Sequence, residues 1–241
     1  MSDLSYRDIS IPKNKEVVVV WSGGLDSTAL IAMMIKDYRC GVYPLFINRG
    51  QGNYQFEKIA IDHYNDIFMQ QFGLLYHQYW EIEVPIPPKQ FKKRLPKCYA
   101  HVMRVSDITN QAVRYALTLE ADAILIGTIP SDGRGNSSKV ALEYFVSKTN
   151  EVRLGTDKPT LEVIAPFLLL HYDKREIIAW SNSNGIDLSK TRSCVGNQLE
   201  PCEECDPCKN RNEALDPHFY SSDCNHGKTR TSKHEEGCPY P

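Results

Sequence analysis

The chain has 241 residues and a formal net charge of −2. This length is enough for one α/β domain with an appendage. The small net charge gives no global reason to expect a nucleic acid or an anionic membrane as partner. No apolar run approaches the roughly 18–20 residues of a membrane helix, and the polar N-terminus has no apolar signal segment. We therefore expect a cytoplasmic protein that does not bind a membrane.

The first element in the chain is a valine-rich run that ends in a glycine-containing turn, "VVVVWSGGLDSTALIAMM" at 17–34. Such a run predicts a strand buried on both faces, and the apolar residues after the turn predict a helix over 26–38. Gly23 and Gly24 let the backbone turn sharply and let a ligand approach it. The first N–H groups of a helix lack internal partners and carry the positive end of its dipole. The turn therefore predicts a phosphate site.

The turn is neither a Walker A loop, because it has no lysine, nor a G-x-G-x-x-G loop. It matches S-G-G-x-D-S, which resembles the pyrophosphate loop (PP-loop) of the N-type ATP pyrophosphatases. That resemblance implies cleavage of ATP between the α and β phosphates, with adenylation of a substrate. An ordinary glycine-rich turn is the alternative interpretation. The residues expected to bind the nucleotide are Ser22, Gly23, Gly24, Leu25, Asp26 and Ser27.

Predicted strands and helices alternate along the rest of the chain. Strands are expected at 42–47, 74–84, 123–127 and 161–166, and helices at 54–72, 102–119, 139–150 and between an N-cap at Asp173 and a stop at Gly185. This alternation predicts right-handed βαβ units in a doubly wound, parallel α/β sheet, a Rossmann-like fold. Ligands bind at the C-terminal ends of such strands, where Ser22, Asn48 and Gly127 are expected.

We expect three parts: an α/β domain at 1–185, a metal-binding segment with a C-terminal helix at 186–216, and a polar, poorly ordered tail at 217–241. Six of the eight cysteines follow residue 193. Clustering in a chain expected to be cytoplasmic favours a metal over disulfides.

The cysteines of the second part form C-x-x-C-x-x-C with a fourth cysteine eight residues upstream: Cys194, Cys202, Cys205 and Cys208. Four thiolates in so short a segment predict a closed, tetrahedral zinc site that stabilises the fold. An iron–sulfur cluster is the main alternative, although the ferredoxin run has its fourth cysteine after the triplet. Four unrelated thiols are the other alternative.

Other potential ligands are weaker candidates. The tail holds a possible second metal set in Cys224, His226, His234 and Cys238, at long intervals. The histidines within predicted elements are expected to be structural: His63, His77 and His171.

Taken together, the motifs resemble the QueC (7-cyano-7-deazaguanine synthase) family over roughly residues 16–215. Besides the PP-loop and the cysteines, the matching residues are Gly127, Asp132, Pro166, Lys174, Glu176, Thr191 and Arg211. One segment departs from the family: where it has P-G-R-N, this chain has "HVMRVSD" at 101–107, which keeps the arginine as Arg104. The loop after Asp132 also differs. Both segments lie on the substrate side in the family, so the ATP and zinc assignments are better supported than the substrate.

The resemblance implies an ATP-dependent carbon–nitrogen ligase of queuosine biosynthesis. ATP would activate the carboxylate of 7-carboxy-7-deazaguanine, ammonia would give an amide, and a second activation would give the nitrile. Asp26 or Asp132 would bind Mg²⁺. Lys174 and Arg104 would contact phosphate or carboxylate, although each is equally consistent with a solvated surface charge.

Three alternatives remain open. A related enzyme could join a deazaguanine carboxylate to an amine on a protein or another partner, which the altered segments at 101–107 and 131–138 motivate. A PP-loop tRNA thiolase would require a basic RNA-binding surface, and the one basic run is "KQFKKRLPK" at 89–97. A zinc module without enzymatic activity would not need a complete PP-loop. A homodimer is compatible with the sequence.

Overall fold

The computed structural model describes residues 9–88, 90, 103–132 and 138–216. The described residues leave out the basic run apart from Gln90, the first part of "HVMRVSD" and most of the loop after Asp132. The tail candidates Cys224, His226, His234 and Cys238 also lie outside them.

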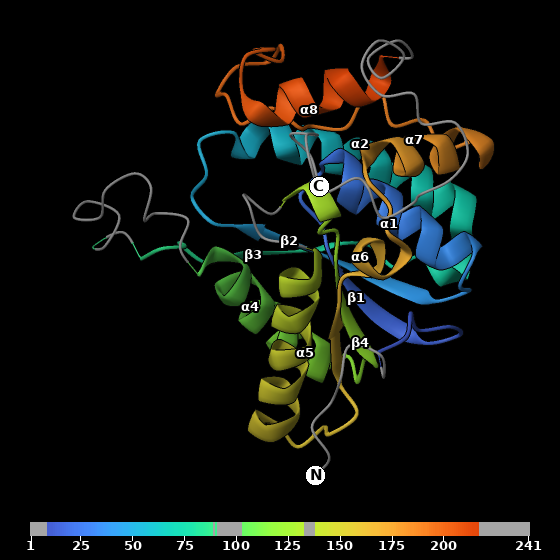
Figure 1. Cartoon of the computed structure of the whole chain (residues 1–241), viewed down its shortest axis with the longest axis vertical. Coiled ribbons are helices and arrows are strands. Elements are labelled where there is room, and N and C mark those ends of the chain that lie inside the picture. Colours follow the sequence, from blue (N-terminus) through green and yellow to red (C-terminus); the bar gives the residue numbers. More distant parts are fainter. Residues whose placement is uncertain (1–8, 89, 91–102, 133–137, 217–241) are drawn as a thin grey trace, which may run out of the picture.

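The centre of the fold is a parallel sheet of five strands in the order β3-β2-β1-β4-β5 (Figure 1). The strands are β1 (Glu16–Val20), β2 (Gly41–Asn48), β3 (Trp80–Glu83), β4 (Ala123–Ile126) and β5 (Glu162–Ile164). Every neighbouring pair is parallel. The order grows outward from β1 in both directions, so the topological switch point lies beside β1. The predicted doubly wound α/β sheet is confirmed.

Helices cover both faces of this sheet (Figure 1). One face packs against α1 (Leu25–Lys36), α2 (Tyr54–Phe72) and α7 (Lys174–Ser183), and the other against α4 (Arg104–Thr118) and α5 (Ser138–Gly155). The short α6 (Pro166–Leu170) follows β5, and α8 (Asp206–Leu215) lies beside α2. In the described part of the chain, no helix is both long enough and apolar enough to span a membrane.

The valine run of β1 is buried on both faces, as its sequence predicts. Val17 and Val19 belong to the hydrophobic cluster under α1, α2 and α7, whereas Val18 belongs to the cluster under α4 and α5. Successive side chains of a strand point to opposite faces, so a central strand in a two-sided sheet needs apolar residues at every position. This burial fixes the end of β1, where the glycine turn begins.

Two predicted strands are shorter in the structure. The segment 74–84 forms a strand only at Trp80–Glu83, because Gly73–Leu75 makes a 3₁₀ turn after α2 and Tyr76 makes a single bridge to Val42. The predicted strand at 161–166 ends at Ile164, because Pro166 begins α6 instead. Proline suits the first turn of a helix, where its missing N–H has no acceptor to lose. Helix α5 also continues to Gly155, past the predicted end.

The predicted N-cap of α7 is confirmed. The Arg175 N–H donates to Asp173 Oδ1 at 2.8 Å, and the Asp173 N–H donates to Glu176 Oε2 at 3.0 Å. These two bonds form a capping box, which fixes where α7 starts and so where Lys174 points its side chain. Gly185 follows the helix with a φ of +68°, as expected for a C-terminal stop.

Candidate active site and metal centre

The turn after β1 depends on glycine at one position for two reasons. Gly23 has a φ of +70°, in the left-handed region that favours glycine. A Cβ at this position would also lie 2.8 Å from the carbonyl oxygen of Glu57 and 3.1 Å from Ile61 Cγ1, both on α2. Helix α2 therefore packs directly under the turn, and only a residue without a side chain fits between them.

The serines at the two ends of the motif close the turn. Ser22 Oγ and Ser27 Oγ are 3.2 Å apart, and the Ser22 N–H donates to Ser27 Oγ at 3.3 Å. Gly24 caps α1 without a side-chain hydrogen bond, so the first N–H groups of the helix remain available to an anion. The Leu25 side chain is 2% exposed and lies in the core, so only its backbone can contact a ligand.

Gly127 supports the turn from the neighbouring strand. It follows β4, and a Cβ there would lie 3.2 Å from both the N and Cα of Ser27. The absence of a side chain lets the end of β4 pack against the backbone of the turn. Gly127 therefore lies at the predicted site, next to the first turn of α1.

Charged residues from distant parts of the chain converge beside the turn. Lys174 Nζ is 2.6 Å from Asp26 Oδ2, and both side chains are mostly buried. The second carboxylate oxygen, Oδ1 of Asp26, is buried and has no hydrogen-bond partner among the described residues. A buried carboxylate oxygen without a partner is costly, so this atom is suited to a cation or a hydrogen-bond donor from a ligand.

Asp132 belongs to the same group of charges. Although the residue as a whole is exposed, its carboxylate is partly removed from water, which raises its pKa, and the negative charge of Asp26 adds to this effect. The Ile129 N–H, which donates to Asp132 Oδ2 at 3.0 Å, and the positive charges of Lys174 and Arg104 act in the opposite direction. Of the four predicted charged residues, Asp26 and Lys174 are in direct contact, and the charges of Asp26, Lys174 and Arg104 all act on the pKa of Asp132.

Arg104 begins α4, directly after a residue with unusual backbone geometry. Met103, the N-cap, has a φ of +61°. It occupies the glycine position of the family's P-G-R-N segment, and it keeps a backbone conformation that favours glycine. Arg104 is exposed, and its charge affects the pKa of Asp132 on one side and those of Arg49 and Glu57 on the other.

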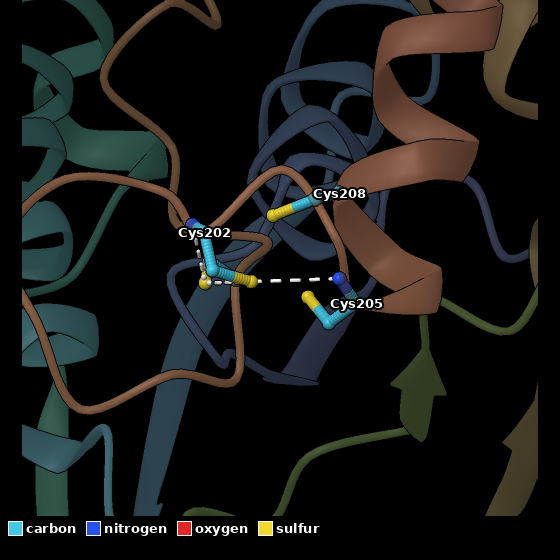
Figure 2. A group of neighbouring side chains, drawn as sticks. Cys202, Cys205 and Cys208 are labelled. Carbon is cyan, nitrogen blue, oxygen red and sulfur yellow. Dashed lines mark hydrogen bonds between the residues drawn. The ribbon is translucent and has the colours of Figure 1, made fainter.

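The four predicted metal ligands form one cluster. Their sulfur atoms all lie within 4.8 Å of one another (Cys194, Cys202, Cys205 and Cys208). Figure 2 shows the sulfurs of Cys202, Cys205 and Cys208 directed toward a common point in front of α8. Cys205 precedes α8 and Cys208 lies in its first turn, so the helix start determines their spacing.

Backbone donors favour the thiolate form at part of this cluster. The Gly196 and Cys202 N–H groups each donate to Cys194 Sγ at 3.3 Å, and the Cys205 N–H donates to Cys202 Sγ at 3.4 Å. Backbone hydrogen bonds from Cys205 and Glu204 lower the pKa of Cys202 to about 6. Burial raises the pKa of Cys208 to about 12, so this thiol needs a cation nearby to ionise at neutral pH.

A buried arginine that the sequence analysis did not identify holds the cysteine loop. Arg192 is 9% exposed and donates four hydrogen bonds to backbone carbonyls, of Cys194 at 3.1 Å, Gly196 at 2.8 Å, Gln198 at 2.7 Å and Leu199 at 2.8 Å. Its guanidinium carbon also lies 4.9 Å from the centre of the Phe56 ring. The one signal in the sequence is its place inside the T-x-x-C motif, between Thr191 and Cys194.

The family's last arginine has a similar structural role. Arg211 donates to the carbonyls of Thr191 at 2.9 Å, Leu188 at 3.1 Å and Ser189 at 3.2 Å, and to Thr191 Oγ1 at 2.8 Å. It thereby fixes α8 to the segment that leads to Cys194. The matched Thr191 and Arg211 therefore bind each other.

The metal centre is joined to the glycine turn by direct hydrogen bonds. The Arg192 N–H donates to the carbonyl of Gly23 at 2.8 Å. Asn53 Nδ2 donates both to the carbonyl of Cys194 at 3.1 Å and to Glu57 Oε1 at 3.0 Å. The two sites therefore share one network, although more than a hundred residues separate them in the sequence.

The histidines expected to be structural have structural surroundings. The His77 ring stacks on Tyr43 with centroids 3.9 Å apart, and the His63 ring meets the edge of Tyr64. His171 ends α6 with a φ of +54°.

A parallel sheet with a glycine turn and a cluster of charged residues at its switch point defines an α/β protein of the PP-loop type. The family model described as "Queuosine biosynthesis protein QueC" matches residues 16–218. The chain belongs to the QueC family, and the resemblance found in the sequence is confirmed.

Curated relatives carry the name of one synthase. A 7-cyano-7-deazaguanine synthase of a Nitratiruptor species is 28% identical over 212 residues, which cover 81% of this chain and 91% of that protein. The synthase of Prochlorococcus marinus (strain MIT 9215) is 28% identical over 222 residues, which cover 85% of this chain and 95% of that protein.

Solved structures with a related arrangement include two enzymes that act on RNA. The U34-tRNA thiolase NcsA of Methanococcus maripaludis, with its 4Fe-4S cluster, has a TM-score of 0.48 at 17% identity over 84% of this chain. A 4-thiouridine synthetase in complex with RNA and ATP has a TM-score of 0.44 at 16% identity over 83% of this chain. This chain covers 64% of the first structure and 51% of the second.

Proposed function

We propose that the chain is an ATP-dependent carbon–nitrogen ligase that converts 7-carboxy-7-deazaguanine to 7-cyano-7-deazaguanine. ATP adenylates the carboxylate, ammonia displaces AMP to give an amide, and a second activation gives the nitrile. The observation that carries the proposal is the complete S-G-G-x-D-S turn at the switch point of a QueC-family sheet. The relatives named as 7-cyano-7-deazaguanine synthases support the choice of substrate and product.

The turn would bind the pyrophosphate leaving group. A carboxylate is a poor electrophile because its leaving group would be oxide, and adenylation supplies a better one. The enzyme then needs to hold the carboxylate in line with the α phosphate and to stabilise charge on the departing pyrophosphate. The available N–H groups at the start of α1 and the hydroxyls of Ser22 and Ser27 suit that charge.

Lys174 and Asp26 would serve the phosphates together. Asp26 holds the ammonium of Lys174 through Oδ2, which positions it beside the turn. The unpartnered Oδ1 of Asp26 and the nearby carboxylate of Asp132 fit Mg²⁺, which prefers oxygen ligands and would neutralise the phosphates. Burial raises the pKa of Asp132 by more than its neighbours lower it, so a bound cation would further stabilise its carboxylate.

The cysteine cluster would bind zinc as a structural ion. Four thiolates at about 2.3 Å from one zinc lie roughly 3.8 Å apart in a tetrahedron. The sulfur atoms here, all within 4.8 Å of one another, are close to that arrangement. In a cubane cluster each cysteine binds a different iron, which requires wider spacing. With four protein ligands, the zinc would have no open position for catalysis.

The direct test is product analysis. Purified protein with ATP, 7-carboxy-7-deazaguanine and ammonium should release AMP and pyrophosphate, and mass spectrometry should find first the amide and then the nitrile. The double variant Ser22→Ala, Asp26→Ala should lose this turnover while keeping its zinc. Release of ADP and phosphate would contradict the proposed chemistry.

The same assay tests the nature of the amine. Ammonium alone should suffice for complete conversion to the nitrile. If the reaction stopped at an adenylate or an amide and proceeded only with a peptide or protein amine, the acceptor would be a macromolecule and the nitrile assignment would be wrong.

A further inference from the structure

Another arginine lies near the glycine turn and has no role in the site described so far. Arg49 follows the last residue of β2, at the same edge of the sheet as the turn after β1. Arg49 is half-buried, and its guanidinium has no hydrogen bond to any described residue. Its backbone is fixed, because the Arg49 N–H donates to Gln51 Oε1 at 2.7 Å.

Arg49 shares the side chain of Gln51 with a buried carboxylate, Glu57, whose hydrogen-bond partners are neutral. Glu57 is 7% exposed, and it accepts hydrogen bonds from Gln51 Nε2 at 2.6 Å and from Asn53 Nδ2 at 3.0 Å. Burial raises the pKa of Glu57, while the positive charges of Arg49 and Arg104 lower it. Glu57 therefore provides a negative charge that keeps Arg49 at the sheet edge without a direct ion pair.

Arg49 and Arg104 both belong to segments at this edge of the sheet, because Arg49 follows β2 and Arg104 begins α4, the helix that leads to β4. Burial lowers the pKa of Arg49, the negative charge of Glu57 raises it, and the positive charge of Arg104 lowers it by a smaller amount, so the charges of the three residues interact. Glu57 offsets one of the two positive charges, so the group keeps a net positive charge that suits one further anion. Guanidinium groups match the two oxygens of a carboxylate with paired N–H donors.

We propose that Arg49 is a substrate-binding residue that, together with Arg104, holds the carboxylate of the deazapurine acid next to the nucleotide. Glu57 is its positioning residue. This inference rests on the proposed function, since it names the residues that bind the substrate of that reaction.

The position of the pair favours the substrate carboxylate over the phosphates of ATP. The phosphates have their own partners in the α1 start, Ser22, Ser27 and Lys174, which lie at the end of β1 and at α7. Arg49 comes from the end of β2 and Arg104 from the start of α4, so they approach the turn from other elements. A carboxylate gripped by this pair would lie beside the nucleotide, where in-line attack on the α phosphate requires it.

The test compares how wild type and Arg49 variants bind the carboxylic acid and its uncharged nitrile product. Binding of 7-carboxy-7-deazaguanine, of 7-cyano-7-deazaguanine and of ATP is measured by calorimetry for wild type, Arg49→Gln and Arg49→Lys. Arg114→Gln is the matched control, because Arg114 is exposed further along α4 and makes one side-chain bond, to Gln111. Thermal unfolding and zinc content show whether each variant is folded.

We expect Arg49→Gln to weaken binding of the acid by tenfold to a hundredfold, because a charge-assisted hydrogen bond is lost. Binding of the nitrile and of ATP should change by less than about threefold, and Arg49→Lys should be intermediate for the acid. Equal weakening of acid and nitrile, or weakening of ATP alone, would overturn the assignment, since a structural or phosphate-binding role predicts those results.

The outcome for wild type separates this inference from the proposed function. If wild type does not bind the acid, the proposed function fails and Arg49 loses its ligand. If wild type binds the acid and Arg49→Gln binds it equally well, the function stands and the role of Arg49 is wrong. Should Arg49→Gln fail to fold, Arg49→Lys, which keeps the charge opposite Glu57, decides between these results.

Discussion

Replacement of Arg192 by methionine tests whether the cysteine loop is held in place before the metal binds. Methionine has a similar length and still packs on Phe56, but it removes the charge and all five donors. Four backbone carbonyls between Cys194 and Leu199 lose their partner at once. The sheet and the PP-loop side chains keep all of their own contacts.

The expected loss of stability follows from these contacts. A hydrogen bond that involves a charged group contributes about 1.5–3 kcal/mol, and contacts made by one side chain are not additive. Some of the freed carbonyls regain water, because the loop from 195 to 200 is largely exposed. The cation–π interaction with Phe56, which methionine does not replace, contributes about 1 kcal/mol. We therefore expect a loss of about 3–4 kcal/mol, which for a chain of this size lowers the melting temperature by roughly 6–16 °C.

The assay is thermal unfolding of the zinc-loaded protein together with a zinc competition titration. Arg192→Met should weaken zinc binding tenfold to a hundredfold, as expected when a group that orients metal ligands is removed. Arg114→Met is the control for loss of an arginine, and it should change neither quantity. A melting temperature within about one degree of wild type, with unchanged zinc affinity, would refute the role given to Arg192.

Three further substitutions test the backbone and the charges of the site by chemical denaturation. Gly23→Ala should destabilise the fold by more than Gly185→Ala, because both have a positive φ but only Gly23 has a carbonyl 2.8 Å from the added Cβ. Met103→Gly should stabilise the chain by about 0.5–1 kcal/mol, since it relieves the left-handed φ of an exposed side chain. Asp132→Asn should stabilise the metal-free protein at pH 8 but not near pH 3. The pKa of Asp132 is raised above 3.8 by folding, so the folded state holds its proton more tightly and stability falls as the pH rises through the raised pKa. A stabilisation independent of pH would contradict this cause.

The sequence predicted the central part of the fold because the signals there are local. A valine run, a glycine turn and an apolar helix follow one another between residues 17 and 36, and each pattern is complete within its own segment. The edge of the sheet was less predictable. Residues 74–84 contain many strand-forming side chains, but the exit of α2 at Gly73 leaves only Trp80–Glu83 in register with β2. Chain geometry, rather than propensity, decides the length of such an edge strand.

The candidate site was predictable where a motif names its residues and unpredictable where contacts create the role. Asp26 and Lys174 were identified from motifs, and the structure places them 2.6 Å apart. Arg192 and Glu57 look like ordinary surface charges in the sequence. Glu57 binds Asn53 and Arg192 binds the carbonyl of Cys194, which Asn53 also binds from 141 residues away, and no local pattern contains that information.

The glycine turn connects the cysteine segment directly to the α/β sheet. Helix α2 packs against Gly23, and the Glu57 carbonyl on that helix leaves no room for a side chain. The carbonyl of Gly23 accepts a hydrogen bond from the Arg192 N–H. The side chain of Arg192 meanwhile binds the loop that carries the cysteines. Arg192 therefore contacts both sites, the turn through its backbone and the cysteine loop through its side chain. A shift of the cysteine loop would move Arg192 and, through it, the turn. The structural zinc proposed above would restrict such shifts without taking part in chemistry, because its four ligands would come from both ends of the loop that Arg192 binds.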